Sequence, residues 1–329
     1  MIVTRTPLRI SLFGGGTDYP EWYMRNRGAV IGLAINKYVY VTAMPLSPLH
    51  PYKFRLYWSK IERCQTADEI EHPVVRAVLK MEDWRDPMGF SIIADLPARN
   101  GLGSSSAFTV GFLNALGIYS SKQDLAKGAI YVERRLLGEH GGHQDQWLCA
   151  LGGMNRLDFT DTGWEVNPVA ATGIVNSLFL LHTGVARTAS HVSAEQKYRT
   201  KDGLCDKQLI ETLALVDEAY DVLQHQTKST ESMVHDISRI MHEAWRIKRT
   251  MSSQITNPRI DELYEECLRS GALAGKICGA GAGGFFLAIV PEHAQQCFLE
   301  RMERRVPVIR VGLDTQGSIV WPEPSQQAI

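Results

Sequence analysis

This chain has no marked excess of charge of either sign and no long apolar run. Its 329 residues include 35 Lys and Arg against 36 Asp and Glu, a net charge of -1, without a clustered basic stripe. A nucleic-acid-binding surface needs such a basic patch, so the composition argues against a nucleic-acid partner. No apolar run reaches about 18 residues, and residues 1–5 are typical of a strand rather than of a signal peptide. We therefore expect a cytoplasmic protein with no membrane partner.

Paired cysteines are also missing. The six cysteines are widely scattered and include no C-x-x-C pair, which predicts free thiols in a reducing compartment. His140 and His143 lie close together in the sequence, but no cysteine or third histidine stands at zinc spacing beside them, so we expect no metal site there. The length suggests about two domains with a well-buried core.

The most informative segment that is present is a glycine-serine loop, Pro97-Ala-Arg-Asn-Gly-Leu-Gly-Ser-Ser-Ser-Ala107. Residues 90–94 before it predict a strand, and the spacing of apolar residues across 104–116 predicts a helix that begins at the serines. The free N–H groups of the first helical turn then face the loop, and the glycines let the backbone close on a phosphate chain. The alternative is that Ser104 only caps a helix after a tight turn.

Two further glycine clusters stand at residues 12–19 and 276–285. Neither is a Walker A loop, because no Lys-Ser or Lys-Thr follows a glycine at the required spacing. The second cluster contains a literal G-x-G-x-x-G, the fingerprint of dinucleotide-binding folds. That fingerprint must open a helix, whereas residues 285–290 continue as an apolar strand. The context therefore argues against a dinucleotide site.

The order of predicted elements is mixed and does not alternate between strand and helix. Residues 167–173 interrupt the pattern, and we place a domain boundary there, giving domains at 1–175 and 176–329. Strands are predicted at 38–43, 53–58, 90–94, 178–181, 285–290 and 306–311, and helices at 74–81, 104–116, 124–137, 147–151, 205–226, 231–250, 258–271 and 292–304. Such an order favours an α+β fold over a doubly wound sheet.

In this order, the three glycine clusters resemble the signature motifs of the GHMP kinases, the family of galactokinase, homoserine kinase, mevalonate kinase and phosphomevalonate kinase. The first, Thr6-Pro-Leu-Arg-Ile-Ser-Leu-Phe-Gly-Gly-Gly-Thr-Asp-Tyr19, has Pro-Leu-Arg and Gly-Gly-Gly where the family usually has Pro-Gly-Arg and Gly-Glu-His. This version is similar to the branch that contains the D-glycero-D-manno-heptose 7-phosphate kinases. Other segments similar to that branch are Gln144-Asp-Gln146, Leu151-Gly-Gly-Met-Asn155, His182-Thr-Gly-Val-Ala-Arg187 and Gly275-Lys-Ile-Cys-Gly-Ala-Gly-Ala-Gly-Gly284.

The resemblance covers nearly the whole chain and implies a two-domain GHMP kinase fold. The N-terminal domain would resemble domain 2 of ribosomal protein S5, and the C-terminal domain would be ferredoxin-like. The implied enzyme is a sugar kinase that uses ATP and Mg²⁺ and acts on a small sugar phosphate. The nucleotide phosphates would be held by Gly101, Leu102, Gly103, Ser104, Ser105 and Ser106.

The resemblance also implies a metal site at Ser105 and Glu133. Ser105 stands where the family's Gly-Leu-Gly-Ser-Ser places its metal serine. On a helix over 124–137, Glu133 would lie on an otherwise apolar face, and a buried acid needs a partner. The alternative for Glu133 is a structural ion pair with an arginine.

Asp145 matches the family's catalytic acid, and it lies in the first turn of a short helix, where the dipole favours its ionised form. Arg9 would keep Asp145 unprotonated and add positive charge near the transferring group. Asp18 corresponds to the acid that binds sugar hydroxyls. The alternatives are a plain helix-start aspartate for Asp145 and a surface ion pair for Arg9 and Asp18. Further candidate substrate contacts are Gly16, Thr17 and Gly281, with Arg187 and Lys276 as candidate cations for a sugar phosphate.

The expected reaction is transfer of the γ-phosphoryl group of ATP to the anomeric hydroxyl of D-glycero-D-manno-heptose 7-phosphate, giving the 1,7-bisphosphate. One alternative is another anomeric sugar kinase, acting on fucose or a galactose-like sugar. Another is a catalytically silent GHMP-fold sensor that binds ATP and sugar, although retention of Asp145, Glu133, Ser105 and Arg9 argues against it. The sequence carries no signal for the oligomeric state.

Overall fold

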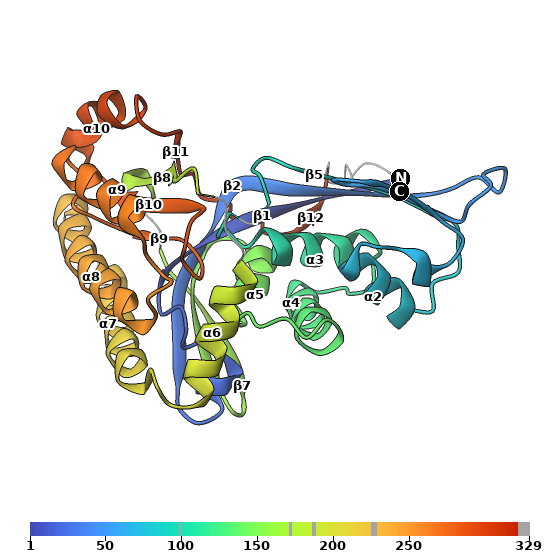
Figure 1. Ribbon diagram of the computed structural model, residues 1–329, viewed down its shortest axis with the longest axis horizontal. Coiled ribbons are helices and arrows are strands. Elements are labelled where there is room, and N and C mark those ends of the chain that lie inside the picture. The colour runs from blue at the N-terminus through green and yellow to red at the C-terminus, as the bar shows by residue number, and fades with distance from the viewer. Residues whose placement is uncertain (99, 171–172, 186–188, 225–228, 322–329) are drawn as a thin grey trace.

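Two β-sheets with their covering helices make up the structure, a computed structural model that describes residues 1–98, 100–170, 173–185, 189–224 and 229–321. The larger sheet carries helices α2 to α5 on one face, and the smaller sheet is covered by α7 to α10 at the other end of the molecule (Figure 1). The predicted α+β fold is confirmed.

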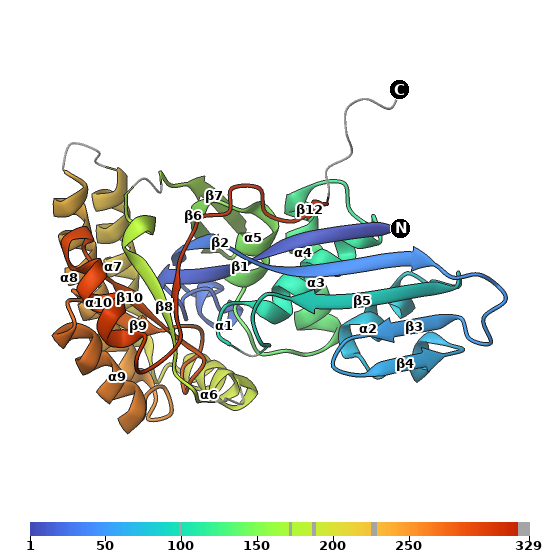
Figure 2. The same cartoon turned by 90° about the horizontal axis from the view of Figure 1, so that it is seen from above.

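The larger sheet has eight strands, and most of them can be followed side by side in Figure 2. Its order is β12 (Ile319–Val320), β1 (Ile2–Phe13), β2 (Gly28–Pro45), β5 (Met88–Ala94), β3 (Phe54–Tyr57) and β4 (Ile61–Cys64), while β6 (Met154–Thr160) pairs with β2 and with β7 (Gly163–Pro168). All pairs are antiparallel except β3 with β5. Strand β2 is shared, because residues 28–33 pair with β6 and residues 39–45 pair with β5. The strand predicted at 38–43 is thus the second half of a longer one.

The α-helices among the described residues of the first part of the chain are α1 (Pro20–Tyr23), α2 (Pro73–Met81), α3 (Ser104–Ala115), α4 (Lys122–Tyr131) and α5 (Gln144–Leu151). Helix α3 is buried on nearly all sides from Ser106 onward, because it lies between the sheet and helices α4 and α5. A Cβ on Gly111 would lie 2.7 Å from the Thr6 hydroxyl, so glycine lets α3 pack directly on β1. This contact holds the middle of α3 against the strand that carries Arg9.

The smaller sheet has the order β11 (Val308–Arg310), β8 (Leu178–His182), β10 (Phe285–Ile289) and β9 (Ala274–Ile277), all antiparallel. Helices α6 (Ala189–Lys201), α7 (Asp206–Gln224), α8 (Thr230–Met251) and α9 (Pro258–Arg269) connect β8 to β9, and α10 (Gln295–Met302) connects β10 to β11. This is the β-α-β-β-α-β order of a ferredoxin-like unit. The G-x-G-x-x-G segment is the turn between β9 and β10 and opens no helix, which confirms that it is not a dinucleotide fingerprint.

The domain boundary near residue 175 stays a prediction. Strand β7 ends at Pro168 and β8 begins at Leu178, but the late strand β12 returns to the larger sheet. The described residues include all six cysteines, none of which forms a disulfide bond, and five of them are buried. No helix within the described residues is long and apolar enough to cross a membrane.

Candidate active site

The three glycine clusters meet at one place. The backbone N–H of Arg9 donates to the carbonyl of Leu102 at 2.9 Å, and the N–H of Phe285 donates to the carbonyl of Asn100 at 3.0 Å. A Cβ on Gly101 would lie 2.6 Å from the carbonyl oxygen of Cys278, so the glycine-serine loop lies directly against the turn after β9. The loop is therefore held between β1 of the larger sheet and the hairpin of the smaller one.

The glycine-serine loop leads into α3 through two left-handed residues, Gly101 at φ 85° and Gly103 at φ 73°. Only glycine adopts such angles readily. Gly103 is the N-cap of α3, and no side chain caps the helix. The alternative of Ser104 as a capping residue is therefore wrong, and the N–H groups of the first turn have no capping side chain. An uncapped helix start of this kind suits an anion.

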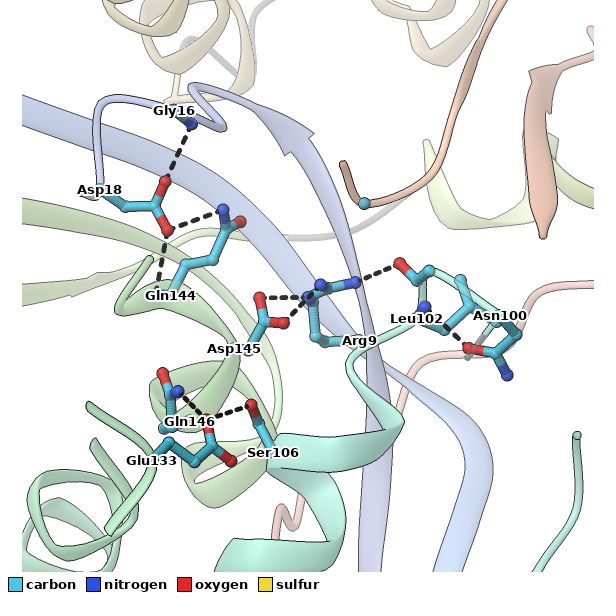
Figure 3. Close-up of polar contacts among 12 residues, drawn as sticks. Arg9, Gly16, Asp18, Asn100, Leu102, Ser106, Glu133, Gln144, Asp145 and Gln146 are labelled. Carbon is cyan, nitrogen blue, oxygen red and sulfur yellow. Dashed lines mark hydrogen bonds and ion pairs between the residues drawn. The ribbon is translucent and has the colours of Figure 1, made fainter. Parts of the chain in front are cut away.

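Arg9 and Asp145 form a bidentate pair at the centre of the site (Figure 3). The Nε and Nη2 atoms of Arg9 donate to Oδ1 and Oδ2 of Asp145 at 2.7 and 2.6 Å, and Nη1 donates to the carbonyl of Gly101 at 2.7 Å. Burial disfavours the charge on Arg9, but the charge and hydrogen bonds of Asp145 outweigh it, so the pKa of Arg9 is raised. The Asp145 side chain keeps 25% of its surface exposed. The structure thus brings the predicted catalytic pair together and leaves Asp145 accessible.

Three consecutive residues at the start of α5 contact three different charged groups. Asp145 contacts Arg9, the Gln144 side chain donates to Asp18, and the Gln146 side chain donates to Glu133 (Figure 3). Both glutamines belong to the Gln144-Asp-Gln146 motif, but the sequence predicts no role for either of them. The sequence signal that could identify the two glutamines is that they are polar residues on either side of an acid, on a helix that is otherwise buried.

Asp18 is buried, with 1% of its surface exposed. Its Oδ1 accepts from the N–H of Gly16 at 2.9 Å, and its Oδ2 accepts from the N–H of Gln144 at 3.3 Å and from the Gln144 carboxamide at 3.0 Å. Burial raises the pKa of Asp18, and the charge of Asp145 raises it further, while these hydrogen bonds work in the opposite direction. A Cβ on Gly142 would lie 2.0 Å from Oδ2, so that glycine is required for Asp18 to reach α5. Asp18 is therefore not a surface ion-pair partner.

Glu133 lies on a π-helical turn, η2 (Val132–Leu136), and not on the regular helix predicted over 124–137. The N–H of Leu137 donates to the carbonyl of Val132 at 3.0 Å, the spacing of a π-turn. Such a turn holds one residue more than an α-helical turn, so the 3.6-residue period does not describe how Glu133 is placed. The side chain is nevertheless buried, as predicted. Its neighbours are the hydroxyls of Ser106 and Thr109 and the carboxamide of Gln146, and the structural ion pair with an arginine is not found among the described residues.

The hydroxyl that contacts Glu133 is that of Ser106, at 2.9 Å from Oε2, whereas Ser105 is exposed one residue earlier. The other carboxyl oxygen of Glu133, Oε1, has no hydrogen-bond partner among the described residues. Burial, followed by the nearby charge of Glu139, raises the pKa of Glu133. Mg²⁺ prefers hard oxygen ligands. The unpartnered carboxylate oxygen of Glu133 and the neighbouring serine hydroxyls are ligands of this kind, so these residues fit the metal. No cluster of three or more His, Cys, Asp or Glu suited to a metal exists in the described ranges, which include His140 and His143.

The remaining predicted substrate contacts lie in different settings. The Thr17 hydroxyl is fully buried and bonded to the backbone of Gly14 and Ala29, so it holds the first glycine loop together. Gly16 has φ 110° and lies beside Asp18. Lys276 is buried on β9 and its ammonium donates to the carbonyl of Leu12 at 2.6 Å.

Burial, with a contribution from Arg9, lowers the pKa of Lys276 to about 8. Gly281 has φ 118°, and a Cβ there would lie 2.8 Å from the backbone of Ile255. Arg187 lies outside the described residues. Lys276, the predicted sugar-phosphate cation that lies among the described residues, is therefore not at the surface.

Comparisons with known proteins find two family models that match the chain. The family described as GHMP kinases N terminal domain matches residues 70–153, and the one described as GHMP kinases C terminal matches residues 231–307. The chain is 26% identical over 313 residues to a D-glycero-alpha-D-manno-heptose 7-phosphate kinase of Campylobacter jejuni, covering 88% of this chain and 89% of the relative. It is 27% identical to a galactokinase of Thermococcus kodakarensis, with 88% and 89% coverage.

A solved structure with a similar fold is that of a D-glycero-D-manno-heptose 1-phosphate kinase from Bacteroides thetaiotaomicron. It superposes with a TM-score of 0.70 at 20% identity and covers 99% of this chain and all of its own. At that identity the likeness supports the fold alone. The models of the N-terminal and the C-terminal domain both match, the first in the part of the chain that forms the larger sheet and the second in the part that forms the smaller sheet. The chain therefore belongs to the GHMP kinases.

Proposed function

We propose that this kinase transfers the γ-phosphoryl group of ATP to the anomeric hydroxyl of D-glycero-D-manno-heptose 7-phosphate. The observation that carries the proposal is the bidentate pairing of Arg9 with Asp145 beside the uncapped start of α3. This places a carboxylate, a guanidinium and an anion-binding helix start within one site, which is what phosphoryl transfer requires. The named heptose kinase relative supports the choice of acceptor.

Asp145 is the proposed proton acceptor. As the acceptor hydroxyl oxygen bonds to the γ-phosphorus, the bond from that phosphorus to the bridging oxygen breaks, ADP leaves, and the hydroxyl proton passes to the Asp145 carboxylate. Arg9 orients the carboxylate through both of its oxygens and contributes positive charge beside the transferring group. A silent sensor has no chemical reason to keep this pair in an accessible position.

The loop residues 101–106 are proposed to hold the nucleotide phosphates. Gly101 and Gly103 keep side chains away from the loop backbone, and the first N–H groups of α3 supply donors and positive dipole. Glu133 and the serine hydroxyls of the loop are proposed to hold Mg²⁺, which when bound neutralises charge on the phosphates. Ser105 and Ser106 both remain candidates, because Ser106 contacts Glu133 and Ser105 faces outward.

A free sugar is the second candidate acceptor. Lys276, one of the two cations proposed for the 7-phosphate, is buried and bonded to the backbone of Leu12. A galactokinase is also among the relatives, with coverage similar to that of the heptose kinase. These two observations favour testing unphosphorylated hexoses beside the heptose phosphate.

The experiment is an ADP-release assay with ATP and Mg²⁺ against a panel of sugars and sugar phosphates. We expect kcat/KM to be at least about tenfold higher for the heptose 7-phosphate than for the unphosphorylated heptose, because a charge-assisted contact is worth about 1.5–3 kcal/mol. Arg187→Ala should reduce kcat/KM for the phosphorylated heptose more than for free sugars. Equal use of fucose, galactose or free heptose would overturn the heptose phosphate as the acceptor.

A further inference from the structure

Gly15 is a glycine that the fold itself does not require. Its neighbours need glycine: Gly14 has φ 88° and its Cβ would lie 2.0 Å from the carbonyl oxygen of Ala29, and Gly16 has φ 110°. Gly15 has no left-handed φ, and a Cβ there would meet only the Ser11 hydroxyl at 3.5 Å and the Gln144 carboxamide nitrogen at 3.7 Å. These are ordinary contact distances. The protein therefore has room for a side chain at this position and does not use it.

The two side chains that face Gly15 carry buried polar atoms without a partner. Neither the hydroxyl of Ser11 nor the carboxamide oxygen of Gln144 has a hydrogen bond within the described part of the chain. Both residues are buried, with 8% of their surface exposed. An unsatisfied buried polar group costs stability, so its presence needs an explanation. The Ser11 hydroxyl faces Gly15 directly, and the Gln144 oxygen belongs to the carboxamide whose nitrogen faces Gly15. The two unsatisfied groups point to a bound molecule that satisfies them.

The orientation of the Gln144 carboxamide follows from its neighbours. Both oxygens of Asp18 accept backbone N–H groups, from Gly16 and Gln144, so the group facing Asp18 must be the donating Nε2. The oxygen of Gln144 then turns away from Asp18. Figure 3 shows this carboxamide between Asp18 and the Arg9–Asp145 pair, with its oxygen on the side away from Asp18. Ser11 stands two residues after Arg9 on β1. The unpartnered atoms are therefore placed beside the proposed point of phosphoryl transfer.

We propose that Gly15, Ser11 and Gln144 form a specificity-determining subsite that binds hydroxyl groups of the acceptor. The inference rests on the proposed sugar kinase function and adds which residues select the acceptor. The Gln144 oxygen can only accept a hydrogen bond, and the nitrogen of the same carboxamide is bonded to the Asp18 carboxyl, so the subsite suits neutral hydroxyl donors and disfavours a phosphate. Arg9 is already bonded to Asp145 and Gly101. The bare backbone at Gly15 leaves space for an acceptor carbon where most residues would place a side chain.

The first test removes the Ser11 hydroxyl. Ser11→Ala should raise the acceptor KM about five- to tenfold through the lost hydrogen bond, leave the ATP KM within about twofold, and not lower the melting temperature. The last point separates binding from structure, since the hydroxyl has no protein partner to lose. A clearly lower melting temperature would show that the hydroxyl supports the fold and would contradict the subsite.

The second test fills the space at Gly15. Gly15→Ala should fold with an unchanged melting temperature and raise the acceptor KM, and Gly15→Val should raise it further. Gly141→Ala is the matched control, because Gly141 also lacks a left-handed φ and has no atom within 4 Å of its Cβ position. Unchanged acceptor KM values in both Gly15 variants would overturn the proposal.

Different results would overturn the proposed function and the proposed subsite. If the wild-type protein phosphorylates no sugar, the proposed function is wrong. If the wild type is active and Ser11→Ala shifts KM only for phosphorylated acceptors, the function stands and the subsite binds phosphate instead of hydroxyls. The hydroxyl subsite predicts the same fold-change in KM for a free sugar and for its phosphate ester.

Discussion

Asp145 accepts two hydrogen bonds from Arg9, although 136 residues separate them in the chain. The contact joins the first turn of α5 to β1, and the third donor of the same guanidinium binds the glycine-serine loop at Gly101. One buried arginine therefore fixes the relative positions of the proposed proton acceptor and the proposed phosphate loop. A change at either residue is expected to alter chemistry more than nucleotide affinity.

Asp145→Asn should lower kcat by about 10² to 10⁴, the range for loss of a general base, while ATP binding stays within a few-fold. The asparagine keeps the shape of the side chain but cannot accept the hydroxyl proton. Steady-state kinetics and nucleotide titration measure the two effects. Asp161→Asn, at an exposed position, is the control and should behave as wild type. Near-normal turnover of the Asp145 variant would remove this residue from the mechanism.

Glu133→Gln and Ser105→Ala should each raise the Mg²⁺ concentration needed for half-maximal activity. The combined effect of the two changes should be less than additive, because both side chains are proposed to hold one ion. Calorimetric titration of Mg²⁺ into the ADP complex gives a second readout that does not depend on turnover. Ser106→Ala tests the hydroxyl that contacts Glu133 in this structure. Identical Mg²⁺ curves for wild type and Glu133→Gln would make Glu133 a structural acid.

His143 predicts a specific pH dependence of stability. Burial, with the positive charge of Arg134, lowers the pKa of His143 from 6.5 to about 4. Between these values the unfolded chain binds a proton that the folded chain does not, so the free energy of unfolding should fall as pH decreases, by about 3 kcal/mol over the window. His143→Gln should remove this part of the slope in urea unfolding between pH 6.5 and 4.

The control for that experiment is His293→Gln, whose side chain is 69% exposed and should leave the slope unchanged. Carboxyl groups also titrate in this range, and the difference between the His143 variant and wild type isolates the histidine. If the free energy of unfolding depends on pH in the same way in wild type and in His143→Gln, His143 is not held neutral in the fold.

Gly101→Ala should raise the ATP KM and lower stability. A Cβ there would lie 2.6 Å from the Cys278 carbonyl, and φ is 85°, so the loop must move away from the β9–β10 turn at a cost of about 1–3 kcal/mol. Gly117→Ala is the matched control, since its φ is also positive at 65° but no atom lies within 4 Å of its Cβ position. The same change in ATP KM in both variants would argue against a role for the loop contact.

The local parts of the fold could be predicted from the sequence. Helix α3 was expected over 104–116 and spans Ser104–Ala115, because its apolar spacing and its glycine start are local signals. Strands β6 and β7 gave no such signal, and β7 has no buried residue. The full length of β2 follows from its two pairing partners, which are distant in sequence.

Of the site, only the residues within the sequence motifs could be predicted. Arg9, Asp145 and Asp18 came from the resemblance, and the structure brings them to one region. The π-turn that places Glu133 beside Ser106 follows directly on α4, and a regular helical period does not contain it. Whether the Gln144 oxygen has a partner depends on contacts with Asp18, a residue 126 positions away.

The most direct test of the central claim is the product formed from D-glycero-D-manno-heptose 7-phosphate, ATP and Mg²⁺, followed by phosphorus NMR. We expect a new phosphate ester signal at the anomeric carbon, formed in step with ADP, while the 7-phosphate signal is retained. With the Asp145→Asn protein we expect no such signal on the same time scale. ADP formation with phosphate at another position, or no sugar product under these conditions while a free sugar is phosphorylated, would contradict it.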